Sequence, residues 1–334
     1  MNLSGNEGLN VLSLFDGVSC AMVGLERAGI KVGKYYAVEI DPTPTKVSQK
    51  NYPQIVRPAG DVRCLTKEMV GQVDLLVGGS PCQDLSIAKQ GRQGLEGNKS
   101  SLFFEYVRIL KAVKPRWFLL ENVASMPIKD RDIITREMGV EPVMFNASLV
   151  SAQNRKRLFW TNIDFELPTD RRIFLKDILE EDGVVYAPMV SNGKAHCLTA
   201  SYSKTSATPR QIEHNTRKGQ RTMVLGASMR GRKQADGTYK KQLEVRQDGK
   251  ASSLTSMATN DLALVSVEKV VRILTPVECE RLQGLPDGYT DCIAKTWRYK
   301  VLGNAFNVDV VAHIFKNLAV EHNGRTTTGE KGIP

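Results

Sequence analysis

The sequence has no long hydrophobic run and few residues from which metal sites or disulfide frameworks are built. No stretch of its 334 residues approaches the roughly 20 consecutive apolar residues that a membrane-spanning helix needs, and residues 1–10 lack the pattern of a secretory signal. The six cysteines form no C-x-x-C pair and no paired spacing with the four histidines. We therefore expect a cytoplasmic protein with free thiols, no metal site and no membrane contact.

Net positive charge is also small over most of the chain. The net charge is +10, and residues 191–250 hold thirteen Lys and Arg against four Asp and Glu, so this short stretch carries almost all of it. A local basic patch suits a polyanionic partner, because Lys and Arg displace counterions from phosphates. The same composition also describes a solvated basic loop, and charge alone leaves both interpretations open.

The pattern over residues 10–163 alternates short apolar runs with helical stretches, which predicts an α/β fold with a mostly parallel, doubly wound sheet. The expected strands are 10–14, 35–38, 74–77, 117–120, 143–147 and 158–161, with the last two forming a hairpin. Apolar spacing predicts helices over 21–28, 102–113 and 308–318.

The composition changes after Phe165, where Ser, Thr, Gly, Lys and Arg become frequent and no convincing long helix is found. Core-like sequence resumes at Val270. We therefore predict one main domain from residues 1–165 and 270–321, with a smaller, loop-rich domain, residues 166–269, inserted into it. The polar tail 322–334 is predicted to be disordered.

Polar residues follow the predicted strands, at the edge where open parallel sheets bind ligands. The first strand leads into Phe15-Asp16-Gly17, a turn whose glycine lets a ligand approach backbone N–H groups. Glu39 lies about twenty residues downstream, where dinucleotide-binding folds place the acid that binds a ribose diol. Asp61 could hold an adenine amino group. Each acid alone is more often a solvated loop residue, but together they favour an adenosine-type ligand.

Cys82 lies between Pro81 and Gln83 in a loop that follows a buried strand, and most free cysteines lie instead in the core. This placement suits a reactive thiolate. Glu121 occupies the matching position one strand later, where a glutamate could protonate a ring nitrogen or hydrogen-bond to it. Arg155 and Arg157, in a Gln-x-Arg-x-Arg pattern, are expected in the tight turn of the hairpin; a surface basic turn is the simpler interpretation of these two.

These motifs, in this order and spacing, resemble the DNA cytosine-C5 methyltransferases of bacteria and phages, including those of restriction-modification systems, with local likeness to the animal de novo enzymes. The resemblance covers residues 10–165 and 270–320. Its motifs are Phe15 to Gly17, Glu39, Asp61, Pro81-Cys82-Gln83, Glu121-Asn122-Val123, Gln153-x-Arg155-x-Arg157, the Arg272 to Gly284 segment and Gly303-Asn304-Ala305.

The resemblance implies a Rossmann-like domain that binds S-adenosylmethionine and a monomeric enzyme that flips a cytosine out of double-stranded DNA. Cys82 would attack C6 of the base, Glu121 would act at N3, and Arg155 or Arg157 would hold the base oxygen and position the Cys82 loop. The implied cofactor contacts are Phe15, Asp16, Gly17, Ser19, Glu39, Ile40, Asp61, Val62, Pro81, Leu102, Asn304 and Ala305.

The insert lies where this family has its target-recognition domain. We expect its basic residues to bind phosphates, with Arg217, Lys218, Arg230, Arg232 and Lys233 as the candidates.

Three alternatives are weaker. Methylation of cytosine in tRNA would use the same scaffold, but the tRNA-modifying relatives carry a Cys-Phe-Thr element that this sequence lacks. A non-catalytic DNA-binding regulator has no need of Cys82, Glu121 and Arg157 together. A nicotinamide oxidoreductase would carry G-x-G-x-x-G in the first turn, and Pro81-Cys82-Gln83 would be unexplained.

Overall fold

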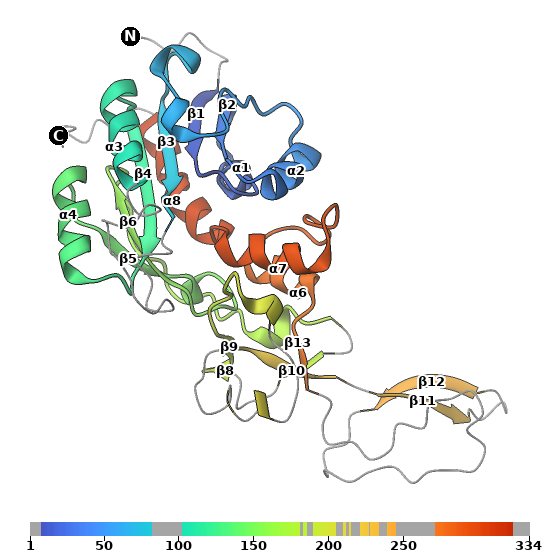
Figure 1. Cartoon of the computed structure of the whole chain (residues 1–334). Coiled ribbons are helices and arrows are strands. Elements are labelled where there is room, and N and C mark those ends of the chain that lie inside the picture. Colours follow the sequence, from blue (N-terminus) through green and yellow to red (C-terminus); the bar gives the residue numbers. More distant parts are fainter. Residues whose placement is uncertain are drawn as a thin grey trace.

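The computed structural model describes residues 8–81, 102–180, 183–185, 190–204, 210–211, 214, 221–226, 228–233, 239–244 and 271–322. Its centre is a six-stranded sheet in the order β2-β1-β3-β4-β6-β5 (Figure 1). The strands are β1 Leu9–Leu14, β2 Val32–Val38, β3 Leu75–Gly79, β4 Trp117–Val123, β5 Val143–Asn146 and β6 Lys156–Thr161. Strand β6 is antiparallel to β4 and β5, whereas β2, β1, β3 and β4 are mutually parallel. The predicted α/β class, the six strands and the pairing of the last two are confirmed.

Alternate residues of β1 pack into two separate cores, as expected for a strand covered on both faces. Val11 belongs to the core that includes Leu25 and Phe315, and Leu12 belongs to the core that includes Phe103 and Tyr106. Helices α1 Cys20–Arg27 and α8 Val308–His322 therefore cover one face, and α3 Leu102–Val113 and α4 Ile128–Met138 the other.

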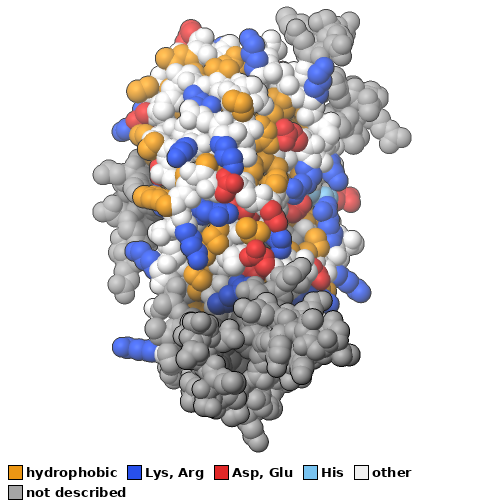
Figure 2. Space-filling model, turned by 90° about the vertical axis from the view of Figure 1, so that its right-hand side faces the viewer, with side chains coloured by type: hydrophobic (Ala, Val, Ile, Leu, Met, Phe, Trp, Pro, Cys, Tyr) orange, Lys and Arg blue, Asp and Glu red, His pale blue; other side chains and the backbone are white. Residues whose placement is uncertain are grey.

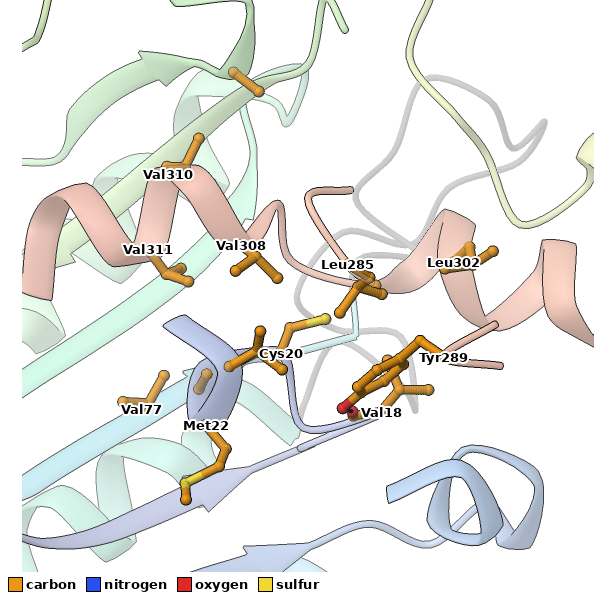
Figure 3. Close-up of a cluster of buried hydrophobic side chains, with 14 of the residues drawn as sticks. Val18, Cys20, Met22, Val77, Leu285, Tyr289, Leu302, Val308, Val310 and Val311 are labelled. Atoms are coloured by element: carbon orange, nitrogen blue, oxygen red, sulfur yellow. Dashed lines mark hydrogen bonds between the residues drawn. The ribbon is translucent and has the colours of Figure 1, made fainter. Parts of the chain in front are cut away.

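The carboxyl-terminal helices pack directly against the turn that follows β1. Helices α6 Pro276–Leu282 and α7 Lys295–Asn304 precede α8 in the chain. In Figure 3, Cys20 of α1 points towards Leu285 and Val308, and Tyr289 lies beside Val18. The Tyr289 hydroxyl donates to the Val18 carbonyl at 2.7 Å. Residues from near both ends of the chain thus share one hydrophobic core, which includes Val11 and Leu318.

The described parts of the insert form short strands below the main sheet (Figure 1). A three-stranded sheet joins β7 Gly183–Val185, β10 Met223–Gly226 and β13 Val271–Ile273. Strands β8 Val190–Ser191 and β9 Lys194–Ala195 pair with each other, and so do β11 Ser228–Lys233 and β12 Tyr239–Glu244, whose ribbon projects away from the body. No helix among the described residues is long and apolar enough to cross a membrane.

Candidate active site

The turn after β1 has a backbone that its own side chains hold in place. Phe15, Gly17 and Ser19 all have positive φ, at 56°, 60° and 62°, a conformation that costs energy for residues other than glycine. The partly buried Asp16 carboxylate accepts hydrogen bonds from the Ser19 hydroxyl at 2.5 Å and the Tyr35 hydroxyl at 2.7 Å. Burial raises the pKa of Asp16. Hydrogen bonds between side chains therefore hold the strained backbone of this turn in place.

Glu39, at the carboxyl end of β2, is tied to this turn. One of its oxygens accepts the Gly17 N–H at 2.9 Å, and the other accepts the Asp41 N–H at 2.8 Å. Burial raises the pKa of Glu39, although both N–H groups oppose the shift. Each oxygen keeps a lone pair that can accept a hydroxyl, as binding of a ribose diol requires. Its neighbour Ile40 is 68% exposed and gives the site an apolar surface.

Asp61 lies at the start of the 3-10 helix Val62–Cys64, where its carboxylate accepts the Arg63 N–H. The Arg63 guanidinium also binds this carboxylate through Nε and Nη2, at 3.0 and 2.6 Å. The hydrogen bond from Arg63 lowers the pKa of Asp61. This partner was not predicted from the sequence.

A cavity of about 420 Å³ joins these residues, a size typical of cofactor pockets. Of the predicted cofactor residues, all but one line it: Phe15, Asp16, Gly17, Glu39, Ile40, Asp61, Val62, Pro81, Leu102, Asn304 and Ala305. Ser19 is not among the lining residues, because its hydroxyl contacts Asp16 and Ser48 in the core. The partly buried carboxylate of Glu39 and the exposed side chain of Ile40 thus give one cavity both hydrogen-bond acceptors and an apolar surface.

The same cavity reaches a pair of opposite charges on neighbouring strands. Glu121 of β4 and Arg157 of β6 are joined by an ion pair of 2.7 Å between Oε1 and Nε. Their side chains are only 12% and 16% exposed. In the register Glu121 faces Phe159, so Arg157 lies two residues along on the same face of the sheet. Arg155 also lines the cavity.

The predicted tight turn around the Gln-x-Arg-x-Arg pattern is wrong in detail. Residues 147–155 connect β5 to β6 and include the 3-10 helix Ala147–Leu149, and Arg157 lies within β6 itself. The apolar runs in the sequence identify the two strands, but they do not show at which residue β5 ends and β6 begins. Arg155 lies just before β6, and both it and Arg157 nevertheless line the cavity.

The predicted nucleophile, Cys82, lies outside the described residues, but the residues before it are positioned. Asn122 is buried, and its side-chain amide donates to the Ser80 hydroxyl at 3.1 Å. Pro81, the next residue, lines the cavity. The Glu121-Asn122 dipeptide therefore contributes one side chain to the cavity and one to the loop that leads to Cys82.

The described thiols differ in their chemistry. Burial raises the pKa of Cys20 to about 12 and that of Cys279 well above its ordinary value, which disfavours the thiolate form of both. Burial also raises the pKa of Cys197, but the positive charges of Arg155 and Arg157 outweigh it and the net shift is downward.

Sequence reasoning missed Lys300 and Phe306, which also line the cavity. Lys300 pairs with Asp41 at 3.2 Å, and its ammonium lies 4.4 Å from the centre of the Trp297 ring. Lys300 precedes Asn304 by four residues in α7, so the two share a helix face. The four-residue spacing from Asn304 could therefore have identified Lys300 from the sequence.

The five predicted phosphate contacts fall within residues 217–233. Arg217 and Lys218 lie outside the described residues, and Arg230, Arg232 and Lys233 lie on β11. On the face in Figure 2, blue Lys and Arg side chains are interspersed with red Asp and Glu side chains.

The residues that the structure describes contain no cluster of three or more His, Cys, Asp or Glu side chains that could hold a metal ion.

Comparison with known proteins identifies the family. The family described as C-5 cytosine-specific DNA methylase matches residues 9–319. The type II methyltransferase M.HhaI of Haemophilus parahaemolyticus is 25% identical, over 95% of this chain and 96% of its own. The type II methyltransferase M.FnuDI of Fusobacterium nucleatum is 29% identical, over 93% and 94%.

Solved structures share the fold. The methyltransferase EhMeth of Entamoeba histolytica superposes with a TM-score of 0.62 at 15% identity, over 95% of this chain and 99% of its own. The S. pombe Dnmt2 methyltransferase gives 0.58 at 17% identity, over 95% and 100%. The resemblance inferred from the motifs is confirmed, and this chain belongs to the C-5 cytosine-specific DNA methylase family.

Proposed function

We propose that this enzyme transfers the methyl group of S-adenosylmethionine to C5 of a flipped-out cytosine in a specific sequence of double-stranded DNA, through a covalent bond between Cys82 and C6. The observation that carries the proposal is the single cavity that holds Glu39 and Ile40 at one end and the Glu121–Arg157 pair at the other, with Pro81 in its wall. A cofactor and a base bound there would lie side by side.

The chemistry follows from the weakness of C5 as a nucleophile. Addition of the Cys82 thiolate to C6 pushes electrons into the ring, and Glu121 stabilises them by holding a proton at N3. C5 then becomes the enamine-like carbon that accepts the methyl group. A base then takes the C5 proton, the C5–C6 double bond re-forms, and the bond from C6 to the Cys82 sulfur breaks. Arg157 keeps Glu121 in place through their 2.7 Å ion pair, and its side chain lines the cavity where the base oxygen would lie.

Bound S-adenosylmethionine would supply the electrophilic methyl group. Glu39 would accept the ribose hydroxyls, Asp61 the adenine amino group, and Phe15 and Ile40 would cover the adenine ring. The main chain at Asn304 and Ala305 would form the opposite wall.

The inserted residues 166–269 would form the target-recognition domain, and residues 1–165 and 270–321 the catalytic domain. The insert would bind phosphates through its Lys and Arg residues and read base edges in the groove. Membership of a family with bacterial type II relatives suggests action on bacterial or phage DNA in the cytoplasm.

Bisulfite sequencing of a methylation-deficient bacterial host that expresses the protein tests the proposal. We expect protected cytosines at one recurring DNA sequence, and none in cells that express Cys82→Ser. Protection confined to tRNA would favour the RNA-modifying alternative. Tight DNA binding without protected cytosines would favour the non-catalytic regulator.

A further inference from the structure

The two arginines of the Gln-x-Arg-x-Arg pattern lie in different surroundings, although both line the cavity. Arg157 forms the ion pair with Glu121. Arg155 is only 3% exposed, and burial lowers the pKa of its guanidinium. The two guanidinium groups therefore bind different parts of the molecule.

Arg155 directs its donors to the main chain of two distant segments. Nη1 donates to the Leu198 carbonyl at 2.9 Å and lies 3.4 Å from the Cys197 thiol. Nη2 donates to the carbonyls of Ala305 at 2.8 Å and Gly303 at 3.2 Å. Each terminal nitrogen carries two N–H groups, so these four acceptors use all of them. Only Nε remains, and it has no hydrogen-bond partner among the described residues.

The two segments that Arg155 joins are already in contact. Leu198 belongs to the described insert segment 190–204, and Gly303 and Ala305 form a wall of the cofactor cavity. A Cβ atom on Gly303 would lie 2.2 Å from the backbone nitrogen of Ala200, so a side chain there would push the segments apart. Gln153, also buried, accepts the Leu198 N–H at 3.4 Å.

We propose that Arg155 is a positioning residue that fastens the cofactor wall 303–305 to the insert segment 197–200, and does not hold the base oxygen. The inference rests on the proposed function, because it assigns this wall to S-adenosylmethionine. Arg155 therefore governs how tightly the cofactor binds, whereas Arg157 governs the rate of the reaction. The planar guanidinium suits this role, since an ammonium cannot reach all of these carbonyls in one plane.

The test compares Arg155→Lys with Arg157→Lys, which makes the same chemical change two residues away. Calorimetry measures the affinity for S-adenosylhomocysteine, and single-turnover methylation at saturating cofactor and DNA measures the reaction. For Arg155→Lys we expect affinity to fall about tenfold, the effect of losing one hydrogen bond to a charged group, with the saturated rate retained. For Arg157→Lys we expect the affinity to be retained and the rate to fall about 100-fold.

Gly303→Ala tests the same junction without altering Arg155, should Arg155→Lys fail to fold by circular dichroism. It should weaken S-adenosylhomocysteine binding in the same direction, because its methyl group separates the wall from the insert. Unchanged affinity in the folded variants, or a fall confined to the saturated rate of Arg155→Lys, would overturn this inference alone. Failure of the unmodified protein to bind S-adenosylhomocysteine would overturn the proposed function, and this inference with it.

Discussion

The two ends of the cavity are built in different ways. At the cofactor end the main-chain N–H groups of Gly17 and Asp41 hold Glu39, and hydroxyl groups bound to Asp16 hold the turn. At the reaction end two side chains, Glu121 and Arg157, form an ion pair from adjacent strands. Substitutions at the first end should therefore act on affinity, and substitutions at the second end on rate.

The largest effect is expected at the reaction end, from Glu121→Gln. The change keeps the size of the side chain but removes the carboxyl group that pairs with Arg157 and holds the proton at N3. The single-turnover rate should fall about 10²- to 10⁴-fold, the usual effect of removing a general acid or base, with affinity for S-adenosylhomocysteine unchanged. Glu105→Gln is the matched control, since Glu105 pairs with Arg108 on α3. A variant with full activity would remove Glu121 from the mechanism.

At the cofactor end, Glu39→Ala and Asp61→Ala should each weaken S-adenosylmethionine binding by about 1 to 3 kcal/mol, because each leaves a polar partner unpaired. The structure also predicts which of the two substitutions weakens binding more. Asp61 is already bound by Arg63, so we expect its loss to have the smaller effect. Calorimetry that finds both affinities unchanged would contradict the assignment, and a larger effect for Asp61 would reverse the ranking.

The pH dependence of binding gives a smaller, more specific effect. Ribose hydroxyls donate to the ionised form of Glu39, so the cofactor and a proton compete for this carboxylate. Because burial raises the pKa of Glu39, affinity should decline on acidification at a higher pH than an ordinary glutamate would give. Calorimetry over a pH series measures this decline. In Glu39→Gln the same part of the profile should flatten, and an identical profile would show that another group titrates.

Outside the cavity, neutralising Arg230, Arg232 and Lys233 should weaken DNA binding without changing cofactor affinity. The slope of log affinity against log salt should become shallower by about 0.9 for each phosphate that the variant no longer neutralises. Fluorescence anisotropy at several salt concentrations measures this slope. If the slope stays the same, the phosphates are bound by other residues.

The fold was predictable where apolar runs are continuous. Every strand of the main sheet contains such a run, whereas α2 Pro42–Asn51 buries only Pro44, Val47 and Ser48 and was missed. Its start nevertheless carried a signal, since Asp41 accepts the Thr43 N–H and Pro42 occupies the first turn. Helix α4, IKDRDIITREM, was missed for the same shortage of apolar residues.

The candidate site was predictable as far as the sheet positions it. Glu39 and Glu121 follow or end parallel strands, so local sequence was enough to bring them to one edge. The partners of Arg155 were not predictable, because Leu198 and Ala305 lie 43 and 150 residues away and present carbonyl groups that every residue has. Ser19 was assigned to the cofactor through the family resemblance, but its side chain is buried and its hydroxyl contacts Asp16 and Ser48.

The central claim is that Cys82 bonds to C6 of the cytosine, and fluorine at C5 tests it most directly. In DNA whose target cytosine, identified by bisulfite sequencing, carries that fluorine, methylation leaves no proton at C5 to remove, so Cys82 cannot be expelled. We predict a protein–DNA adduct that survives denaturing electrophoresis, needs S-adenosylmethionine, maps to Cys82 by peptide mass spectrometry and disappears in Cys82→Ser. An adduct on another cysteine, such as Cys197 beside Arg155, would contradict the mechanism.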